Sequence, residues 1–283
     1  MAIRDNILDI KEQLPDGTRL VAVSKYRPVE ELQEAYDAGQ RVFAESRPAE
    51  FAAKAEVLPR DIEWHFIGHL QTNKLKLVLP RCTLIHSVDS IHLLDAIQKY
   101  ASDNRLTVNV LIEVHIGAET TKQGFSIQET EELFSDIPAL LERYPDVRFR
   151  GLMGMASHTD DTARIDSDFA TLKALFDRVK SLFDRTEDLP DRTGDLLDGN
   201  GKLSDRTGDL LDGNGKLSDR TGDLLDGNGK LSDRTGRFSD RIGDHDNTAA
   251  GFTELSAGMS GDWQIALRHG STLVRIGSAI FLR

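Results

Sequence analysis

Cysteine is nearly absent from this 283-residue chain: Cys82 is its one cysteine, so no disulfide can form within it. Aromatic residues make up only 6%, and no apolar run approaches the roughly 20 residues of a membrane-spanning helix. A basic excess is also lacking, since the net charge is −12, which argues against a broad nucleic-acid or anionic-membrane surface. The amino-terminal residues indicate an amphipathic helix rather than a signal peptide. These absences predict a cytoplasmic protein without nucleic-acid or membrane partners.

The chain does contain enough apolar material, 39% of its residues, for one sizeable core. Much of it occurs in eight short runs, several of them continuous rather than alternating, which is typical of strands buried on both faces. The runs are Leu20–Ser24, Val42–Glu45, Trp64–Gly68, Leu84–Val88, Val108–His115, Phe149–Met155, Glu254–Met259 and Leu273–Gly277.

Helical patterns lie between these runs, at 29–38, 126–143 and 169–183, and another precedes the first run. Strands that alternate with helices indicate βαβ units and a parallel sheet. Eight such strands favour an α/β fold of the closed (β/α)8 type, the TIM barrel, which needs about 200–250 residues. An open, doubly wound sheet is the alternative.

A tandem repeat interrupts the pattern before the seventh run. The sequence DRTGDLLDGNGKLS begins at Asp191 and recurs at Asp205 and Asp219, a period of 14 residues (205 − 191), and a partial fourth copy follows. The repeat is rich in glycine and aspartate and lacks aromatic residues, so it can bury little. A calcium loop is disfavoured because the carboxylate needed at its twelfth position is missing. We expect one barrel domain over 1–283, interrupted by a disordered, low-complexity insertion at 186–250.

Lys25 ends the first apolar run, in LVAVSKYRP. Active sites of such barrels form at the carboxyl ends of the strands. Partial burial there would lower the pKa of the amine, and a neutral amine can form a Schiff base with an aldehyde. A lysine at a strand end can equally well reach into solvent, so Lys25 alone does not identify a site.

Two turns near the end of the sequence suit a phosphate group. The seventh run continues as SAGMSGD and the eighth as RIGSAIF, each with small and hydroxyl residues ahead of a helical segment. Unpaired N–H groups at a helix start favour an anion, and barrel phosphate sites are often made by the loops after strands seven and eight. Two routine tight turns are the alternative. The residues concerned are Ser256, Gly258, Met259, Ser260, Gly277 and Ser278.

Arg275 lies within the eighth run, beside these turns. A buried guanidinium needs an acceptor, which could be a structural carboxylate, a ligand phosphate or a ring nitrogen. After the third run, His69, Gln71, Asn73 and Lys74 could line the same rim, or Gln71 could cap the next helix. The histidines have no compact metal-ligand spacing, so we expect no metal site.

Several runs together resemble one family, the pyridoxal 5′-phosphate (PLP) homeostasis proteins, also called YggS-like proteins or proline synthase co-transcribed homologues. These runs are VAVSKYRP, EWHFIGHLQTNK, KQGF, RGLMGMA, LSAGMSGDW and STLVRIGSAIF. Their order and combination are more specific than any single motif, and the resemblance covers the chain outside the repeats. It implies a barrel similar to the N-terminal domain of alanine racemase, with PLP as the cofactor.

The resemblance also implies roles for individual residues. Lys25 corresponds to the lysine that holds PLP covalently as an imine, and Ser260, Gly277 and Ser278 correspond to the phosphate cradle. Arg275 corresponds to an arginine beside the cofactor's ring nitrogen. An arginine there disfavours protonation of the pyridine, which weakens the ring as an electron sink and suits holding PLP more than carbanion chemistry.

The loop after the second run departs from the family pattern. The family commonly has Phe-Gly-Glu-Asn-Tyr or Phe-Gly-Glu-Ser-Arg, followed shortly by Gln-Glu, whereas this chain has Ala44 and Ala49 at the Gly and Gln positions. A glycine whose backbone needed a positive φ would resist the first change. The pocket is therefore expected to differ from that of its relatives on the side formed by this loop.

The resemblance implies a PLP-binding protein of intracellular PLP homeostasis or delivery, not an enzyme. Its partners would be the cofactor and PLP-dependent apoenzymes, and it would be a monomer or weak dimer. The alternative is a PLP-dependent racemase. Alanine racemase takes a tyrosine acid/base from a second domain, whereas this sequence ends soon after the eighth run and only Tyr26 lies near the predicted site. A scaffold that binds proteins through the acidic repeats would leave the phosphate-suited turns unexplained.

Overall fold

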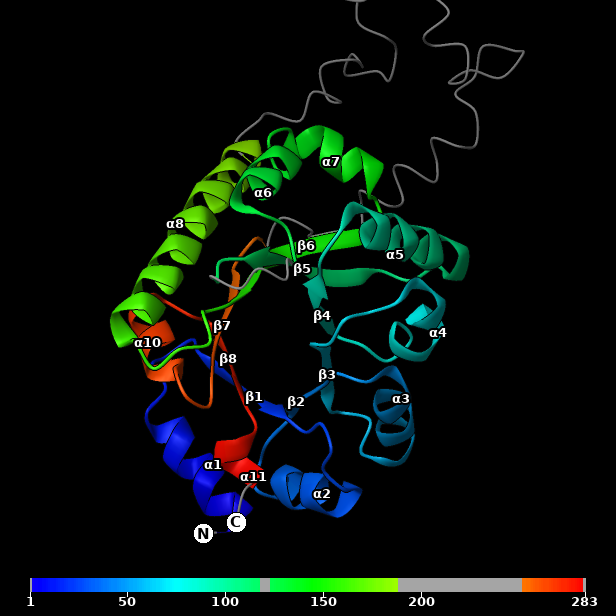
Figure 1. Cartoon of the computed structure of the whole chain (residues 1–283). Coiled ribbons are helices and arrows are strands. Elements are labelled where there is room, and N and C mark those ends of the chain that lie inside the picture. Colours follow the sequence, from blue (N-terminus) through cyan, green and yellow to red (C-terminus); the bar gives the residue numbers. More distant parts are fainter. Residues whose placement is uncertain (1, 118–122, 188–250, 282–283) are drawn as a thin grey trace, which may run out of the picture. The chain divides into compact units, whose positions relative to one another are not determined.

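The computed structural model describes residues 2–117, 123–187 and 251–281. Eight parallel strands close into a barrel in sequence order, β8 pairs with β1, and the helices lie outside the ring of strands (Figure 1). The closed barrel is confirmed and the open sheet is excluded. The strands are β1 (Arg19–Val23), β2 (Val42–Glu45), β3 (Glu63–Phe66), β4 (Leu84–Val88), β5 (Val108–His115), β6 (Val147–Met155), β7 (Glu254–Met259) and β8 (Leu273–Ile276).

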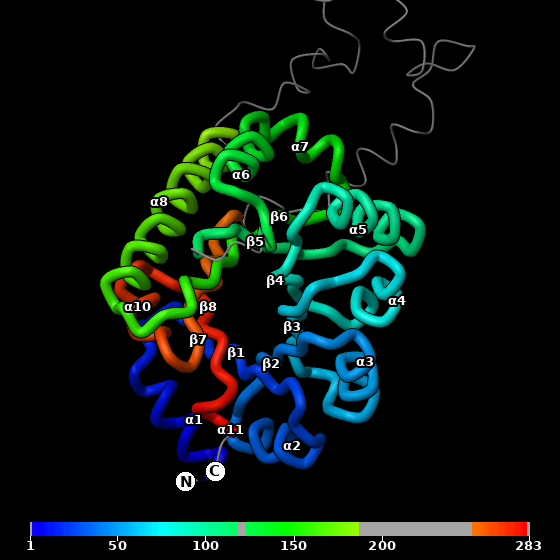
Figure 2. Tube along the Cα trace, in the orientation of Figure 1, coloured from blue at the N-terminus to red at the C-terminus, as the bar shows by residue number. Residues whose placement is uncertain are grey.

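Helices cover the outside of the barrel and connect successive strands (Figure 2). The first and last helices meet, because Asn6 Nδ2 donates to the carbonyl of Ile280 at 2.9 Å. The helices are α1 (Ile3–Glu12), α2 (Val29–Asp37), α3 (Pro48–Val57), η1 (Thr72–Lys74), α4 (Leu75–Val78), α5 (Ile91–Asn104), α6 (Ile127–Leu133), α7 (Ile137–Arg143), α8 (Thr162–Glu187), α10 (Trp263–Arg268) and α11 (Ser278–Phe281).

The single helix predicted over 126–143 is in fact two helices, α6 and α7. Ser126 caps α6 by accepting from the Glu129 amide, while the Glu129 carboxylate accepts from the Ser126 amide. Asp136 caps α7 through the Ala139 amide, and α7 carries a proline in its first turn. That proline has no N–H with which to continue the hydrogen bonding of α6.

Helix α8 extends to Glu187, beyond the predicted range of 169–183. The predicted insertion at 186–250 overlaps the last two positions of α8, and its tandem repeats, with the calcium loop weighed for them, lie outside the described residues. The barrel itself is a compact unit formed by 1–183 and 252–283.

Successive side chains along the strands face two different apolar clusters. Leu20 and Ala22 of β1 belong to the cluster packed between strands and helices, whereas Val21 between them belongs to a smaller cluster inside the barrel. This alternation is the period of two expected for strands. The inner cluster consists of Val21, Val42, Ala44, Leu84, Leu111, Met153 and Leu273.

Further along three of these strands, the inward-facing side chains become polar. His86, Glu113 and Arg275 each lie two positions beyond an inner-cluster leucine, so they point to the same side of their strands. All three are buried. An apolar layer is thus followed by a polar layer toward the carboxyl ends of the strands, where barrel sites form.

Candidate functional site

A cavity of about 570 Å³ opens at the carboxyl ends of the strands. Its wall is formed by the ends of β1, β6 and β8, by Ser46 and Ile67 directly after β2 and β3, and by the loops that follow β6 and β7. The fold therefore brings Lys25, near the start of the sequence, to the same cavity as Ser260 and Ser278, near its end.

Six of the eight residues predicted to bind the cofactor line this cavity: Lys25, Met259, Ser260, Arg275, Gly277 and Ser278. The other two lie outside the wall. Ser256 is fully buried and hydrogen-bonded to Arg275. Gly258 has φ +89° and packs against α10, where an added Cβ would lie 2.8 Å from that of Ala266. Gly258 therefore shapes the turn, since other residues rarely adopt this φ.

Lys25 lies two residues beyond the end of β1, and it is exposed. The partial burial assumed from the sequence is therefore not observed. Tyr26 has φ +64°, which residues other than glycine rarely adopt, so the backbone turns sharply directly after Lys25. Such a conformation persists only where the surrounding structure holds it.

Buried polar contacts hold the residue that precedes Lys25. Ser24 Oγ donates to Glu45 Oε1 at 2.7 Å, and the Ser24 carbonyl accepts from Lys54 Nζ at 2.9 Å. Lys54 Nζ also forms an ion pair with Glu45 Oε1 at 2.6 Å. Glu45 is fully buried and Lys54 is 7% exposed. Burial raises the pKa of Glu45, while the hydrogen bonds from Lys54 and Ser24 oppose that rise.

Contacts from α3 and its cap residue hold the residue that follows Lys25. The Tyr26 amide donates to Glu50 Oε2 at 3.1 Å, and the Arg47 guanidinium donates to the Tyr26 hydroxyl while lying 4.3 Å from the ring centroid. Glu50 Oε2 also lies 3.7 Å from Lys54 Nζ. Lys25 is thus fixed on both sides by residues of the β2–α3 segment. We call Ser24 and Tyr26, together with Glu45, Glu50 and Lys54 that hold them, the Lys25 clamp.

The two turns predicted to suit a phosphate contact each other. The Gly277 amide donates to Ser260 Oγ at 3.3 Å. A Cβ at Gly277 would lie 3.0 Å from a backbone carbonyl of β1, so the close approach of β8 to β1 favours glycine there. In the turn after β7, Asp262 accepts from the Met259 amide. That amide is therefore already used, while the hydroxyl residues Ser260 and Ser278 line the cavity.

Arg275 is 4% exposed and lines the inner end of the cavity wall. Its Nη1 donates to Ser256 Oγ and its Nη2 to the Gly154 carbonyl at 3.1 Å. Burial lowers the pKa of Arg275 to about 10, against the opposing charges of Asp262 and Glu113, so the guanidinium stays charged at neutral pH. Within the described residues its acceptors are a hydroxyl and a carbonyl, not the carboxylate of a structural ion pair.

The loop between β6 and α8 also lines the cavity, and the sequence analysis missed it. Its lining residues are Ser157, His158, Thr159 and Asp160. Asp168 of α8 anchors this loop, because its carboxylate accepts from the Ser157 amide at 2.8 Å and from the Ser157 hydroxyl at 2.6 Å. The signal was available: the polar run SHTDD directly follows a buried strand.

The structure accommodates both departures from the family pattern, Ala44 and Ala49. Ala44 is fully buried in the inner cluster and pairs within β2 with β1 and β3, in extended backbone. A residue with a Cβ therefore fits at position 44 without strain. Ala49 lies in the first turn of α3, is exposed, and lines neither cavity described for this face.

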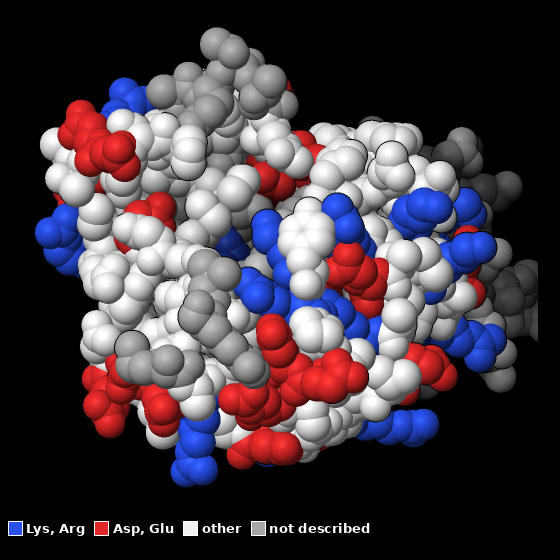
Figure 3. Space-filling model, turned by 60° about the horizontal axis from the view of Figure 1, so that its bottom comes forward, with Lys and Arg blue, Asp and Glu red and all other residues white. Residues whose placement is uncertain are grey.

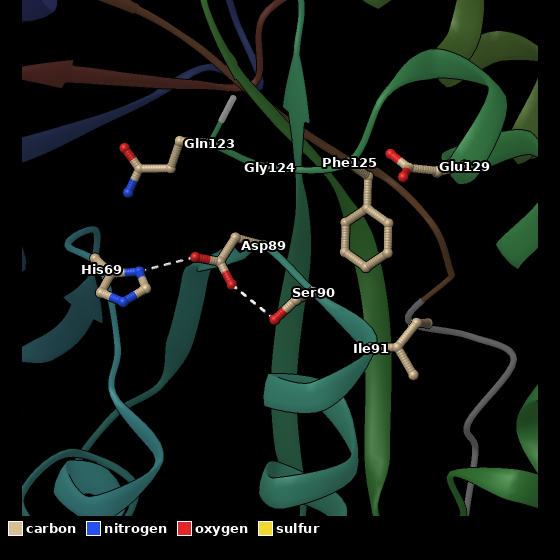
Figure 4. A pocket seen from close by; sticks show the side chains of 8 residues that line it. All are labelled: His69, Asp89, Ser90, Ile91, Gln123, Gly124, Phe125 and Glu129. Carbon is tan, nitrogen blue, oxygen red and sulfur yellow. Dashed lines mark hydrogen bonds and ion pairs between the residues drawn. The ribbon is translucent and has the colours of Figure 1, made fainter. Parts of the chain in front are cut away.

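A second cavity, of about 800 Å³, lies beside the start of α5 and the segment after residue 122 (Figure 4). His69 Nδ1 lies 2.8 Å from Asp89 Oδ2, and Ile91 and Phe125 form an apolar side. This cavity contains none of the residues predicted to bind the cofactor, and residues 118–122, which directly precede Gln123 of its wall in the sequence, are not described. We therefore place the candidate site at Lys25.

Other residues considered from the sequence lie away from the Lys25 cavity. His69 lines the second cavity, and Gln71, Asn73 and Lys74 line neither. Gln71 precedes η1 without a side-chain capping bond. Over the described ranges, no group of three His, Cys, Asp or Glu residues is placed to hold a metal ion. Burial raises the pKa of the Cys82 thiol to about 12, which makes it a poor nucleophile.

Acidic and basic side chains are both present on the face shown in Figure 3, and neither sign covers it. Among the described residues, no helix is long and apolar enough to cross a membrane.

Residues 1–187 match the family model of the alanine racemase N-terminal domain. The chain is 40% identical over 158 residues to the pyridoxal phosphate homeostasis protein of Aquifex aeolicus, covering 56% of this chain and 68% of that protein. It is 32% identical over 188 residues to the protein of the same name from Pasteurella multocida, covering 62% and 79%. The chain therefore belongs to the family of pyridoxal phosphate homeostasis proteins.

Solved structures share the fold. PipY of Synechococcus elongatus without PLP is 25% identical and superposes with a TM-score of 0.69, with 99% of each chain covered. PipY with PLP bound is 24% identical with a TM-score of 0.66 and the same coverage. An alanine racemase from Clostridium difficile is 12% identical with a TM-score of 0.62, and the match covers 99% of this chain but 56% of the racemase. At these low identities, PLP-bound PipY and the racemase show the likeness of fold alone.

Proposed function

We propose that this protein binds PLP in the cavity at Lys25, as an imine with the Lys25 amine, and serves in PLP homeostasis or delivery without strong catalysis. One observation carries the proposal. The fold brings Lys25 and two hydroxyl-rich turns, which are more than 230 positions away in the sequence, to one cavity. The relatives named for PLP homeostasis support the same assignment.

The residues of the cavity fit the chemical groups of PLP. An exposed lysine suits an aldehyde, and Ser260 and Ser278 offer hydroxyl groups to a phosphate. The charged guanidinium of Arg275 remains available at the inner end of the wall. Condensation would form a C=N bond between Lys25 Nζ and the aldehyde carbon, and the aldehyde oxygen would leave as water.

Two features favour holding PLP over catalysis with it. Bound PLP supplies an electron sink only as far as its ring nitrogen is protonated. Arg275 disfavours that protonation, because it is a cation and has no acceptor atom. In the described part of the chain no tyrosine lines the cavity, and the Tyr26 hydroxyl is bonded to Arg47 on an exposed surface. The described residues of the cavity therefore do not supply the tyrosine that serves as the second base in alanine racemase. Incubating the PLP-loaded protein with single-enantiomer amino acids tests this, since turnover above the rate of free PLP would favour the enzyme.

Substituting Lys25 tests the proposal itself. Wild-type protein with added PLP is expected to show an imine absorbance band that borohydride fixes onto Lys25, and Lys25→Ala should lose both the band and the fixed adduct. Absorbance titration and peptide mass analysis measure these outcomes. Lys74→Ala is the matched control, because Lys74 is an exposed lysine outside the cavity. An unchanged band in Lys25→Ala, or no band in the wild type, would overturn the proposal.

We also propose that the barrel is the whole PLP-binding domain and that the 186–250 insertion is dispensable for binding. Replacing 188–250 by a short Gly/Ser linker should leave the imine band and the PLP affinity within about twofold of wild type, because every described residue that lines the cavity belongs to the barrel. Loss of the band in a variant with a normal circular dichroism spectrum would show that the insertion contributes to the site.

A further inference from the structure

Two buried histidines lie inside the barrel and do not line the Lys25 cavity. His65 and His86 are 1% and 0% exposed, and both belong to the inward-facing side of their strands. His86 Nε2 lies 2.9 Å from His65 Nδ1, and His86 Nδ1 lies 2.9 Å from Ser256 Oγ. Ser256 Oγ in turn accepts from Arg275 Nη1. A continuous chain of hydrogen bonds therefore runs across the barrel interior from His65 to Arg275. We call these four residues the interior chain.

Both histidines are neutral at neutral pH, so each ring has one N–H donor and one nitrogen acceptor. Burial lowers the pKa of His65 to about 3 and that of His86 well below its usual value, with the charge of Arg275 adding to the effect at His86. The His86 ring therefore cannot donate from both nitrogens, and its tautomer depends on its two partners, Ser256 and His65.

The guanidinium fixes the direction of the whole chain. Arg275 can only donate, so Ser256 Oγ must offer it a lone pair. Among the described residues, His86 Nδ1 is the acceptor available to the Ser256 O–H. His86 then carries its proton on Nε2 and donates to His65 Nδ1. In this arrangement each of the three contacts along the chain pairs one donor with one acceptor, as buried polar groups require.

We propose that His86 and Ser256 are positioning residues, which through this directed chain hold the Arg275 guanidinium so that its remaining N–H groups face the bound ligand. The inference rests on the proposed function for the identity of that ligand, but the chain itself exists without it. Arg275 has five N–H groups, of which Ser256 and the Gly154 carbonyl engage one each. Among the described residues no carboxylate is hydrogen-bonded to the guanidinium, so the Ser256 hydroxyl is its side-chain anchor, beside the backbone carbonyl of Gly154.

The first test needs no PLP. In the protein without ligand, nitrogen NMR should show His65 and His86 as neutral single tautomers at pH 7, with the His86 proton on Nε2. The Arg275 guanidinium should rotate slowly, because two of its N–H groups are bound. Ser256→Ala and His86→Leu should each release that rotation. Rapid rotation in the wild type, or slow rotation that both variants preserve, would overturn the proposal.

The second test uses PLP-loaded protein. Ser256→Ala and His86→Leu should weaken PLP binding about tenfold, which is the loss of one hydrogen bond to a charged group, and shift the imine absorbance band. Borohydride should still fix PLP onto Lys25. His86→Gln should restore the affinity and the band in part, because an amide can accept from Ser256 and donate to His65. His92→Leu, at an exposed histidine, is the matched control.

The outcomes separate the two claims. Wild-type protein without an imine band would overturn the proposed function, while the NMR experiment would still decide whether the chain holds Arg275. Affinity and band within twofold of wild type in Ser256→Ala would overturn the positioning role. If His86→Leu fails to fold, Ser256→Ala decides alone, because it removes one hydroxyl and leaves the larger side chains in place.

Discussion

Lys54→Met should lower the free energy of unfolding by about 3–5 kcal/mol, which is the cost of breaking a buried ion pair from one side. Glu45 is fully buried and its Oε1 accepts from Lys54 at 2.6 Å, while its Oε2 has no partner among the described residues. Without Lys54, the Glu45 carboxylate keeps only the hydrogen bond from Ser24, so it must either stay charged in an apolar setting or take up a proton. Urea denaturation at pH 7.5 measures the change.

The same substitution should also disturb the proposed imine. Lys54 Nζ binds the Ser24 carbonyl directly before Lys25, and the strained backbone of Tyr26 follows directly after it. Without the clamp, we expect slower imine formation with PLP, at a protein concentration and temperature where the variant is still folded. Loss of stability with an unchanged rate of imine formation would show that the clamp supports the fold and not the position of Lys25.

Lys99→Met is the matched control for Lys54→Met. Lys99 lies 3.0 Å from Asp103 at an i,i+4 spacing on α5, and both side chains are more than half exposed. Such pairs contribute about 0.3–0.5 kcal/mol. A loss in Lys54→Met no larger than that in Lys99→Met would contradict the assignment of Lys54 as a buried ion-pair partner.

The strands could be predicted from the sequence because a parallel barrel strand is buried on both faces. That burial favours mainly apolar runs, and two of the predicted runs, Val42–Glu45 and Leu84–Val88, match the bounds of β2 and β4. Helix breaks were harder. The apolar spacing of 126–143 continues across the break between α6 and α7, and only the side-chain caps at Ser126 and Asp136 mark it. The spacing of apolar residues indicates which face of a helix is buried, but it does not indicate where the backbone hydrogen bonds of the helix end.

The sequence predicted those residues of the candidate site that follow directly after strands. It did not predict those whose position depends on tertiary contacts. Lys25 and Gly277 each follow a strand of an expected barrel, so their meeting at one cavity follows from topology. The Lys25 clamp depends on Lys54, 29 residues away on α3, whose burial no local pattern shows. Likewise, Ser256 belongs to a predicted cofactor motif, yet the register of β7 turns it inward toward His86.

Glu113→Gln should remove the part of the pH dependence of stability that Glu113 contributes in the ligand-free protein. Burial raises the pKa of Glu113 from 4.5 to about 7; the charge of Asp89 adds to the rise, while Arg275 and His69 oppose it. Between these two values the folded protein binds more protons than the unfolded chain, so the free energy of unfolding falls as the pH rises from 4.5 to 7. Glutamine cannot lose that proton. Relative to wild type, the variant should therefore gain up to about 3 kcal/mol on going from pH 5 to pH 8.

Comparing the two proteins at each pH isolates Glu113 from other groups that titrate in this range. His65 and His86, whose lowered pKa values destabilise the fold toward acid pH, are present in both proteins and cancel. Glu56→Gln, at an exposed carboxyl, is the matched control and should change little at either pH. An equal difference between Glu113→Gln and wild type at pH 5 and pH 8 would contradict the raised pKa.

The reason for the raised pKa of Glu113 lies in how the barrel interior places the Arg275 guanidinium. Glu113 Oε2 has no hydrogen-bond partner among the described residues, although Arg275 faces the same interior. The guanidinium instead donates to Ser256 and to the Gly154 carbonyl, so it is aligned with the cavity and not with the carboxylate. If the difference between Glu113→Gln and wild type changes with pH as predicted, the wild-type barrel leaves the Glu113 carboxylate uncompensated at neutral pH and does not pair it with Arg275. That is the arrangement expected if Arg275 serves a ligand and not the fold.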